Sequence, residues 1–386
     1  GDDAALADAA KLLVGAVNPV LIVDRVVRTA EGMAQLVTLA ETLGAPVVDQ
    51  GGRMNFPTTH PLNHTDRAGG LIRGADVILT MEVTDVWGLI NEYIDNEERA
   101  VSSKIKAGTK VISLGTGDLY LKSNYQDFQR YAPVDLSIAG DAETSLPALI
   151  AAVRSAIPQS QHGAIAQRRD KLAEAYTKAR AAAREAAATA WDASPIATAR
   201  LAAELWAQIK NEDWVMVSGE GTLSRWPRRL WTFDKHYSHI GHAGGAGVGY
   251  GIAAAVGAAV ACRDAGRLAV NIQTDGDLMY APGALWTAVH HKIPLLSVMH
   301  NNRAYHQEVM HIQRMANWHN RGVDRAHIGT TITDPFIDYA ALAKSMGMWA
   351  EGPITDPAAL GPALKRAIAV VKQGMPALLD VVCQPR

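Results

Sequence analysis

Helical and strand-like hydrophobic patterns alternate along the first part of the chain. Apolar residues that recur every three or four positions indicate helices, and short β-rich apolar runs indicate buried strands. In order, these patterns cover 4–17 (helix), 20–23 (strand), 33–43 (helix), 46–48, 75–81, 110–114 and 134–138 (strands) and 145–156 (helix). Alternation at this period is typical of a parallel sheet with helices on both faces. We therefore predict a doubly wound α/β domain over residues 1–156.

Residues 157–193 follow a different pattern. The segment is rich in Ala, Arg, Lys and Glu, which favour a helix, but it has little apolar stripe. Its charges alternate in sign, which is typical of a solvated helix and argues against a basic surface for nucleic acid. We interpret the segment as a helical linker between two domains.

Residues 194–386 repeat the alternation of helices and strands. Ser194 followed by Pro195 is typical of a helix start, and the helical pattern then runs to Ile209. Later patterns cover 214–218, 268–272 and 293–299 (strands), 284–290 (helix), 305–328 (irregular), 335–346 and 357–372 (helices) and 377–382 (strand). We predict a second doubly wound domain here. The expected fold class is α/β, with two doubly wound parallel-sheet domains joined by a helical linker.

Polar clusters follow two of these strands. The cluster 275–277 (Asp-Gly-Asp) ends one apolar run, and the cluster 300–302 (His-Asn-Asn) ends the next. The helical pattern between them makes a βαβ unit, so both clusters are expected at the carboxyl edge of one sheet, where open α/β sheets bind ligands. Carboxylate and amide oxygens suit Mg²⁺ or Ca²⁺, and Mg²⁺ usually completes its coordination with phosphate and water. Either cluster alone would more often be explained by the preference of Asp, Asn and Gly for turns. The two clusters together predict a metal site.

A glycine-rich loop precedes an Ala-rich helical pattern. Six of the eleven residues in 241–251 are glycine. Glycine permits close approach of the backbone to a ligand, and the start of the following helix attracts phosphate. No G-x-G-x-x-G register fits, so this is not a dinucleotide fingerprint. Close helix packing through small residues is the competing interpretation for the second half of the loop.

Composition excludes several classes of protein. The 386 residues are enough for two domains, and the hydrophobic content of 48%, charged content of 20% and net charge of −2 describe a globular protein. These values predict no nucleic-acid and no membrane partner. Cys262 and Cys383 lack CxxC spacing, which indicates a reducing compartment, expected to be the cytoplasm. We recognise no secretory signal and no apolar run that could span a bilayer.

The Gly-Asp and Asn-Asn pairs, about 25 residues apart, resemble the cofactor-anchoring motif of thiamine diphosphate (ThDP) enzymes of the acetolactate synthase and pyruvate decarboxylase group. The resemblance implies that Asp277, Asn302 and the main-chain carbonyl of Ala304 hold the Mg²⁺ that binds the diphosphate. Leu278 replaces the usual third-position Gly, and the interval between the pairs is slightly short. We interpret the difference as a shorter turn around 280–283.

The first part of the chain resembles the central domain of the same family, through NPVLIVD, LGAPVVDQGGRMNFPTTHPLNH, GADVILTMEV and VDLSIAGDAETSLPALIAAV. Some relatives hold FAD or ADP in that domain. Here the first strand is followed by Arg25-Val26-Val27 rather than by glycines, whose amides would approach a pyrophosphate. We expect a structural domain without FAD, with nucleotide binding as the alternative.

The resemblance implies further cofactor contacts. Val248 corresponds to the large residue of the family that lies under the thiazolium ring and holds ThDP in a bent conformation. The carbonyl of Ala246 would accept from the exocyclic nitrogen of the aminopyrimidine, which acts as an internal base. The cofactor-binding candidates are Gly244, Gly245, Ala246, Gly247, Val248, Gly276, Asp277, Leu278, Met279, Asn302, Ala304 and Tyr305.

Ten of the 13 histidines lie in the stretch 236–327. A zinc site on the three histidines of 236–242 is the less favoured interpretation, because no carboxylate or Cys stands beside them at ligand spacing. Position favours His242, beside the glycine loop, and His306, after the metal loop, as proton carriers. Glu308 stands where some decarboxylases of the family place an active-site carboxylate, and a solvated helix Glu is the alternative. These three residues are the catalytic candidates.

The implied function is a subunit of a ThDP- and Mg²⁺-dependent enzyme that cleaves or forms a C–C bond next to a carbonyl. The substrate would be a 2-oxo acid or another carbonyl compound, as in 2-oxo acid decarboxylases, acetolactate synthases or acyloin lyases. The segment after Asn302 is expected to face it. Such enzymes also need a pyrimidine-binding domain with an activating Glu, and we expect a second polypeptide to carry it, in a dimer of such pairs or a higher assembly. Removal of that domain by processing is an open alternative.

Two other classes of function compete with this interpretation. A non-catalytic subunit that binds ThDP or stabilises a catalytic partner would be favoured by loss of Asp277 or Asn302, and both are present. A nicotinamide dehydrogenase would carry a glycine fingerprint after the first strand of a domain, and neither domain has one.

Overall fold

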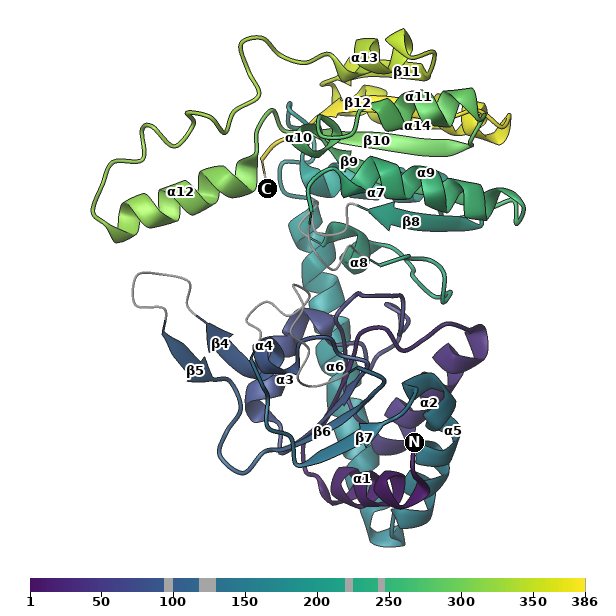
Figure 1. The fold of residues 1–386 in the computed structure, drawn as a ribbon, viewed down its shortest axis with the longest axis vertical. Coiled ribbons are helices and arrows are strands. Elements are labelled where there is room, and N and C mark those ends of the chain that lie inside the picture. The colour runs from purple at the N-terminus through teal and green to yellow at the C-terminus, as the bar shows by residue number, and fades with distance from the viewer. Residues whose placement is uncertain (94–99, 118–129, 219–224, 242–246, 386) are drawn as a thin grey trace. The chain divides into compact units, whose positions relative to one another are not determined.

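The computed structural model describes residues 1–93, 100–117, 130–218, 225–241 and 247–385. These residues form two compact units (Figure 1). The first unit comprises Gly1–Arg180 with Phe233–Tyr237, and the second comprises Ala181–Thr232 with Ser238–Arg386. Each unit contains its own five-stranded sheet. The predicted fold class, α/β with two parallel-sheet domains, is confirmed.

The sheet of the first unit has the strand order β2-β1-β3-β6-β7, and every neighbouring pair is parallel. Its strands are β1 (Pro19–Val23), β2 (Val47–Asp49), β3 (Val77–Met81), β6 (Lys110–Gly115) and β7 (Leu136–Ala139). The strands β1 and β3 are fully buried, as expected where helices cover both faces of a parallel sheet. Outside this sheet, β4 (Asn91–Tyr93) and β5 (Val101–Ser103) pair antiparallel.

The helices of the first unit form two groups. The first group is α1 (Asp3–Gly15), α2 (Ala30–Leu43) and α5 (Ala142–Ala156), in which α1 and α2 both pack against α5. The second is α3 (Ala68–Gly74) and α4 (Val86–Ile90), whose side chains share a core with β1, β3 and β6. The 3₁₀ turns are η1 (Thr65–Arg67) and η2 (Gln159–Gln161). The long helix α6 (His162–Ala187) buries only Ala187, as expected for a solvated helix.

The sheet of the second unit has the order β11-β12-β10-β9-β8 and is parallel throughout. Its strands are β8 (Trp214–Ser218), β9 (Leu268–Thr274), β10 (Leu295–Asn301), β11 (Trp349–Ile354) and β12 (Ala377–Val382). The register pairs His300 with Thr274. The carboxyl ends of β9 and β10 are therefore adjacent, which brings both predicted polar clusters to one edge of the sheet.

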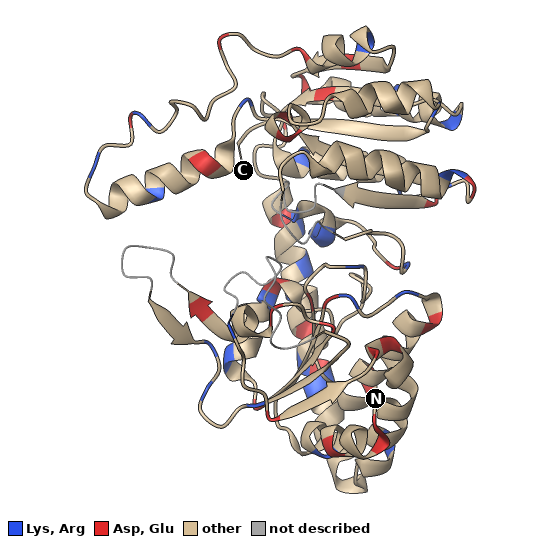
Figure 2. Ribbon diagram, viewed as in Figure 1, with Lys and Arg blue, Asp and Glu red and all other residues tan. Residues whose placement is uncertain are grey.

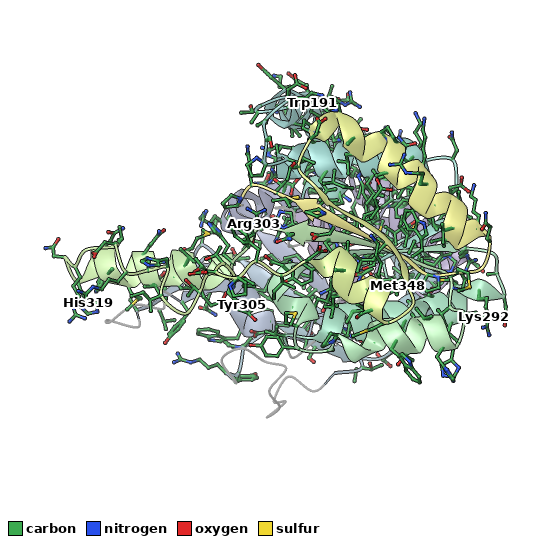
Figure 3. The ribbon with its side chains drawn as sticks, turned by 90° about the horizontal axis from the view of Figure 1, so that it is seen from above. Trp191, Lys292, Arg303, Tyr305, His319 and Met348 are labelled. Atoms are coloured by element: carbon green, nitrogen blue, oxygen red, sulfur yellow. The ribbon has the colours of Figure 1, made fainter. Side chains whose placement is uncertain are left out.

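Helices cover both faces of this second sheet. The helices of this unit are α7 (Thr198–Ile209), α8 (Trp226–Leu230), α9 (Tyr250–Arg263), α10 (Asp275–Leu278), α11 (Gly283–His290), α12 (His306–Trp318), α13 (Tyr339–Ser345) and α14 (Pro357–Lys372), of which α12 lies away from the sheet. The helices α9, α11 and α13 share one apolar core with the sheet. On the opposite face, α14 packs against the sheet and α7 (Figure 3).

The predicted start of the second domain's first helix is wrong. Ser194 and Pro195 precede an extended segment, in which the N–H of Ile196 donates to the carbonyl of Val382 (3.1 Å). This pairing with the end of β12 competes with helix formation, and α7 begins only at Thr198. The helix predicted over 335–346 likewise begins later, at Tyr339. Its N-cap is Asp338, whose carboxylate accepts from the N–H of Ala341 (2.7 Å).

The stretch 305–328, predicted to be irregular, contains helix α12. No residue of α12 is buried, and Figure 1 shows the helix extending away from the sheet. Its Gln, Glu, Met, Arg and Ala residues have high helix propensity, which favours a helix without a buried face. Among the described residues, no helix combines the length and apolar character needed to cross a bilayer. Acidic and basic side chains are interspersed along both units (Figure 2).

Candidate active site

A pocket of about 200 Å³ lies at the carboxyl edge of the second sheet. It opens between the end of β9, the end of β10 and the first turn of α12. The predicted site residues that line it are Val248, Gly276, Asp277, Asn302, Ala304, Tyr305, His306 and Glu308. Arg303 and Tyr305 lie at the base of α12, with His319 at its far end, and Lys292 lies at the opposite end of the sheet (Figure 3).

The carboxylate of Asp277 is held from two sides. Its Oδ1 accepts from the N–H of Gly249, in the glycine-rich loop, at 2.6 Å. Its Oδ2 accepts from the side-chain amide of Gln273, on β9, also at 2.6 Å. A carboxylate has about four acceptor positions, so both oxygens keep the capacity to bind a cation.

The turn after β10 presents the two other predicted metal ligands. Arg303 adopts a left-handed conformation (φ 61°), which reverses the chain between Asn302 and Ala304. The N–H of Ala304 donates to Oδ1 of Asn302 (3.1 Å) and to Oδ2 of Asp275 (3.2 Å). The N–H of Tyr305 donates to the carbonyl of Thr330 (2.7 Å). The turn is thus anchored to both the strand end of β9 and the segment after α12.

Asp275 is a buried carboxylate in the middle of this arrangement. It is 1% exposed and accepts from the N–H of Gly276 (3.0 Å) as well as from Ala304. Burial raises its pKa to about 6, although the hydrogen bonds from these backbone N–H groups oppose the shift. Asp275 therefore stabilises the turn that follows β10 through contacts with backbone amides.

A second buried carboxylate, on the neighbouring strand β12, is connected to the same turn through Asn301. Asp380 on β12 is 0% exposed, and its Oδ1 accepts from the side-chain amide of Asn301 at 2.9 Å. The other side of the Asn301 side chain accepts from the N–H of Arg303 (3.3 Å). Burial raises the pKa of Asp380. The last residue of β10 is thereby tied to the neighbouring strand and to the turn.

One residue of the described part of the glycine-rich loop lines the pocket. Val248 is 56% exposed and lines the pocket. Gly249 has φ 92°, and a Cβ there would lie 2.9 Å from Cβ of Tyr280. Glycine is required at this position because the left-handed backbone and the close neighbour both disfavour a side chain.

The catalytic candidates lie at the start of α12. His306 lines the pocket, and its Nδ1 is buried without a hydrogen-bond partner in the described residues. Glu308 also lines the pocket and is exposed. Gln307 lines it too, and the part of α12 that follows Glu308 does not. That the whole segment after Asn302 faces the substrate stays a prediction.

Other candidate residues have different positions. His242, Gly244, Gly245 and Ala246 lie outside the described residues. Gly247, Leu278 and Met279 are not among the residues that line the pocket, and Leu278 is buried in the core shared with α9 and α11. Sequence reasoning placed Asp275 and His300, which also line the pocket, in the two polar clusters without assigning them a role, and it missed Gln273. The signal that could have pointed to Gln273 is a polar residue inside an otherwise apolar strand.

The donor set fits a small, hard divalent cation such as Mg²⁺. A carboxylate, a side-chain amide and a main-chain carbonyl, from Asp277, Asn302 and Ala304, line one pocket. Across the residues that the structure describes, no group of three His, Cys, Asp or Glu side chains could hold a metal ion. A soft or zinc-type site is therefore not formed by these residues, and oxygen donors dominate the pocket.

A pocket of this kind, with oxygen donors at two strand ends and a glycine loop before a helix, is typical of α/β proteins that bind a phosphorylated cofactor through a metal. The sequence matches two family models. Residues 6–149 match the central domain of thiamine pyrophosphate enzymes, and residues 219–381 match their C-terminal TPP binding domain. The chain belongs to the family of thiamine diphosphate-dependent (thiamine pyrophosphate) enzymes.

Several proteins are similar to this chain. The putative acetolactate synthase large subunit IlvX of Mycobacterium tuberculosis (strain ATCC 25618 / H37Rv) is 33% identical over 138 residues, which are 36% of this chain and 25% of that protein. The sulfoacetaldehyde acetyltransferase of Alcaligenes xylosoxydans xylosoxydans is 26% identical over 410 residues, which cover 99% of this chain and 63% of that protein.

Among solved structures, the thiamine diphosphate-dependent 4-hydroxybenzoylformate decarboxylase of Rhodococcus jostii RHA1 has the same fold. The TM-score is 0.71 at 21% identity, over 99% of this chain and 64% of that chain. This chain thus spans less than two thirds of the length of each of these relatives.

Proposed function

We propose that the pocket binds ThDP through Mg²⁺ and that the protein acts in an enzyme that cleaves or forms a C–C bond next to a carbonyl. The observation that carries the proposal is the meeting of Asp277, Asn302 and Ala304 in one pocket with Val248. When bound, ThDP supplies a nucleophilic carbon and an electron sink for chemistry at a substrate carbonyl. The substrate class is a 2-oxo acid or another carbonyl compound.

The chain's own residues have separate roles in this proposal. Asp277, Asn302 and the carbonyl of Ala304 would hold the metal, and the metal would hold the diphosphate. Val248 would support the cofactor with its exposed apolar side chain. His306 and Glu308, at the start of α12, would exchange protons with the substrate or orient it.

In the active enzyme, His306→Ala is expected to lower kcat about 100-fold, in the range of general acid–base effects. The reason is that Nδ1 of His306 is buried at the pocket without an internal partner in the described residues. ThDP affinity should stay close to that of the wild type. His311→Ala is the matched control, because His311 is exposed on the same helix. Equal kcat values for the two variants would remove His306 from the reaction.

The first unit supports the proposal that no FAD is bound. At the carboxyl edge of its sheet, Glu82 accepts from the N–H of Ala142, at the start of α5 (3.0 Å). Glu143 accepts from the N–H of Thr29, which precedes α2 (3.0 Å). A pyrophosphate needs free amides at such helix starts and would meet like charge here. The central domain would then serve a structural role.

We also propose that a pyrimidine-binding domain on a second polypeptide completes the site, in a dimer of such pairs or a larger assembly. The chain's own matches are to the central and the C-terminal domains of the family. A reducing, cytoplasmic location is consistent with Cys262 and Cys383, which are both buried free thiols.

Native mass spectrometry of the protein from its own source, with ThDP and Mg²⁺ present, tests the proposal. We expect a complex that contains this chain, a second chain of roughly one domain's mass and bound cofactor. Such a complex would then be screened for turnover of 2-oxo acids. A homo-oligomer of this chain without ThDP would overturn the proposed activity for this polypeptide.

A further inference from the structure

Helix α12 has an apolar side that is exposed in the described structure. None of its 13 residues is buried. Ile312, Met315 and Trp318 follow one another at every third position, so their side chains lie along one side of the helix. They are 41%, 38% and 49% exposed. Propensity favours this helix, but a helix of this length is only marginally stable in water without tertiary packing. We therefore expect another surface to cover its apolar side.

Exposed apolar side chains are concentrated in α12 and the segment that follows it. Among the described residues, seven large apolar side chains that are exposed lie between Met310 and Phe336. The described part of the first unit exposes only three, on Val17, Val101 and Tyr131. Single exposed apolar residues are ordinary, but exposed apolar residues that gather on one element mark an interaction site. The stretch 310–336 is therefore the best candidate for a surface that binds a partner.

The base of α12 is fixed beside the candidate active site. The N–H of Tyr305 donates to the carbonyl of Thr330, and the N–H of Ile332 donates to the carbonyl of Arg303, both at 2.7 Å. These bonds belong to a short antiparallel pairing that closes the segment 305–330 at its base. The helix is therefore held at the turn that follows β10, and its first residues stay at the pocket.

The apolar side of α12 is in line with a residue of the pocket. Ile312 and Met315 stand four and seven positions after Glu308, which is the spacing of residues on one side of an α-helix. Glu308 lines the pocket and is exposed. A partner that packs along this side of α12 would therefore also lie beside Glu308, at the edge of the pocket.

The charges on and after α12 indicate what kind of surface fits it. Residues 309–323 contain Arg314 and Arg321 but no Asp or Glu. The one acidic residue of α12 is Glu308, near its start (Figure 2). A second copy of α12 would bring cations against cations, and an anionic lipid surface would meet Glu308. A folded partner can place acidic side chains only where the arginines lie.

We propose that α12 is the docking element for the second polypeptide of the proposed enzyme, and that it binds in an apolar groove of that partner with acidic side chains at the edge of the groove. The proposal rests on the proposed function, in which a second chain completes the site. Helices commonly bind in such grooves through apolar residues at this spacing. Because His306 and Glu308 lie in the first turn of α12, the bound partner also covers the pocket beside them.

The test measures the Kd between the full chain and the second chain that native mass spectrometry identifies, by biolayer interferometry. Ile312→Glu and Met315→Glu keep a residue of high helix propensity but place a charge on the apolar side. Each is expected to raise Kd about 10-fold or more, as for a central residue of an interface. Arg314→Glu should also raise Kd and reduce its dependence on NaCl concentration. Val260→Glu is the matched control, because Val260 is on helix α9 and is 42% exposed. It should bind the second chain as the wild type does.

An unchanged Kd in both Ile312→Glu and Met315→Glu would overturn the inference and leave the proposed function standing. If circular dichroism shows that these variants lose helix content, an unchanged Kd and salt dependence in Arg314→Glu would overturn it equally. Dissociation of a homo-oligomer by the same variants would show that α12 binds a second copy. Loss of binding to phosphatidylserine vesicles would show that it binds lipid, and either result replaces the proposed partner. Wild-type protein without any second chain would instead contradict the proposed function.

Discussion

Replacing Asp277 by Ala is expected to abolish Mg²⁺-dependent binding of ThDP. The variant loses the one carboxylate among the proposed ligands, and Mg²⁺ binds weakly without a charged oxygen donor. It also removes the acceptor for the N–H of Gly249 and for the amide of Gln273, both at 2.6 Å. The glycine loop and β9 would then lose their shared contact, so that the pocket loses its shape as well as its charge.

Isothermal titration with ThDP, with Mg²⁺ and then with a chelator, measures this effect. The wild type should bind only with Mg²⁺, and Asp277→Ala should show no binding under either condition. Asp264→Ala is the matched control, because that carboxylate lies in the same unit and its side chain is 93% exposed. Unchanged affinity in Asp277→Ala would sink the metal-site assignment.

Gly249→Ala is expected to have the second largest effect. A non-glycine residue at φ 92° costs roughly 1–2 kcal/mol. The new Cβ would also lie 2.9 Å from Cβ of Tyr280, and overpacking of this kind costs roughly 1–3 kcal/mol. Relief requires the loop to move, which breaks the hydrogen bond from Gly249 to Asp277. We therefore expect a lower melting temperature and loss of at least roughly 10-fold in ThDP affinity, since each 1.4 kcal/mol is a factor of about ten.

Gly374→Ala provides a matched control for this substitution. Gly374 has a similar backbone angle (φ 87°), but a Cβ there meets nothing within 4 Å. It should show only the conformational cost and bind ThDP as the wild type does. Thermal melting and ThDP titration on both variants separate the clash from the backbone cost. If the two variants behave alike, Gly249 has no special role at the pocket.

Much of the fold follows from local patterns. The alternation of helices and strands predicted two parallel-sheet domains, and β12 (Ala377–Val382) and α14 (Pro357–Lys372) were predicted within the observed bounds. Errors arose where a tertiary contact competed with a local signal. Ser194 and Pro195 resemble a helix start, but Ile196 pairs with the end of β12 instead. Helix α12 was missed because it forms by propensity and has no buried face.

The candidate site could be located from the sequence only in part. The two polar clusters that follow β9 and β10, which contain Asp277 and Asn302, could be recognised in the sequence. The βαβ pattern predicted that they lie at one edge of the sheet. The hydrogen bond from Gln273 to Asp277 could not be predicted, because the position of a polar residue in an apolar run does not identify its hydrogen-bond partner. That partner depends on which face of β9 the side chain occupies and on what α9 presents there.

The sequence by itself determined the class of fold, and it predicted the edge of the sheet at which the candidate site lies and the hard oxygen donors that would suit a divalent cation. These features depend on periodicity along the chain and on residue type, which are local properties. Only the tertiary structure showed that Asp275 and Asp380, which are both buried, hold the turn after β10, and that Asn271 donates to Ser297 and to Gln273, which in turn donates to Asp277. The physical reason is that hydrogen bonds between strands depend on register and facing, and these arise when distant segments pack together.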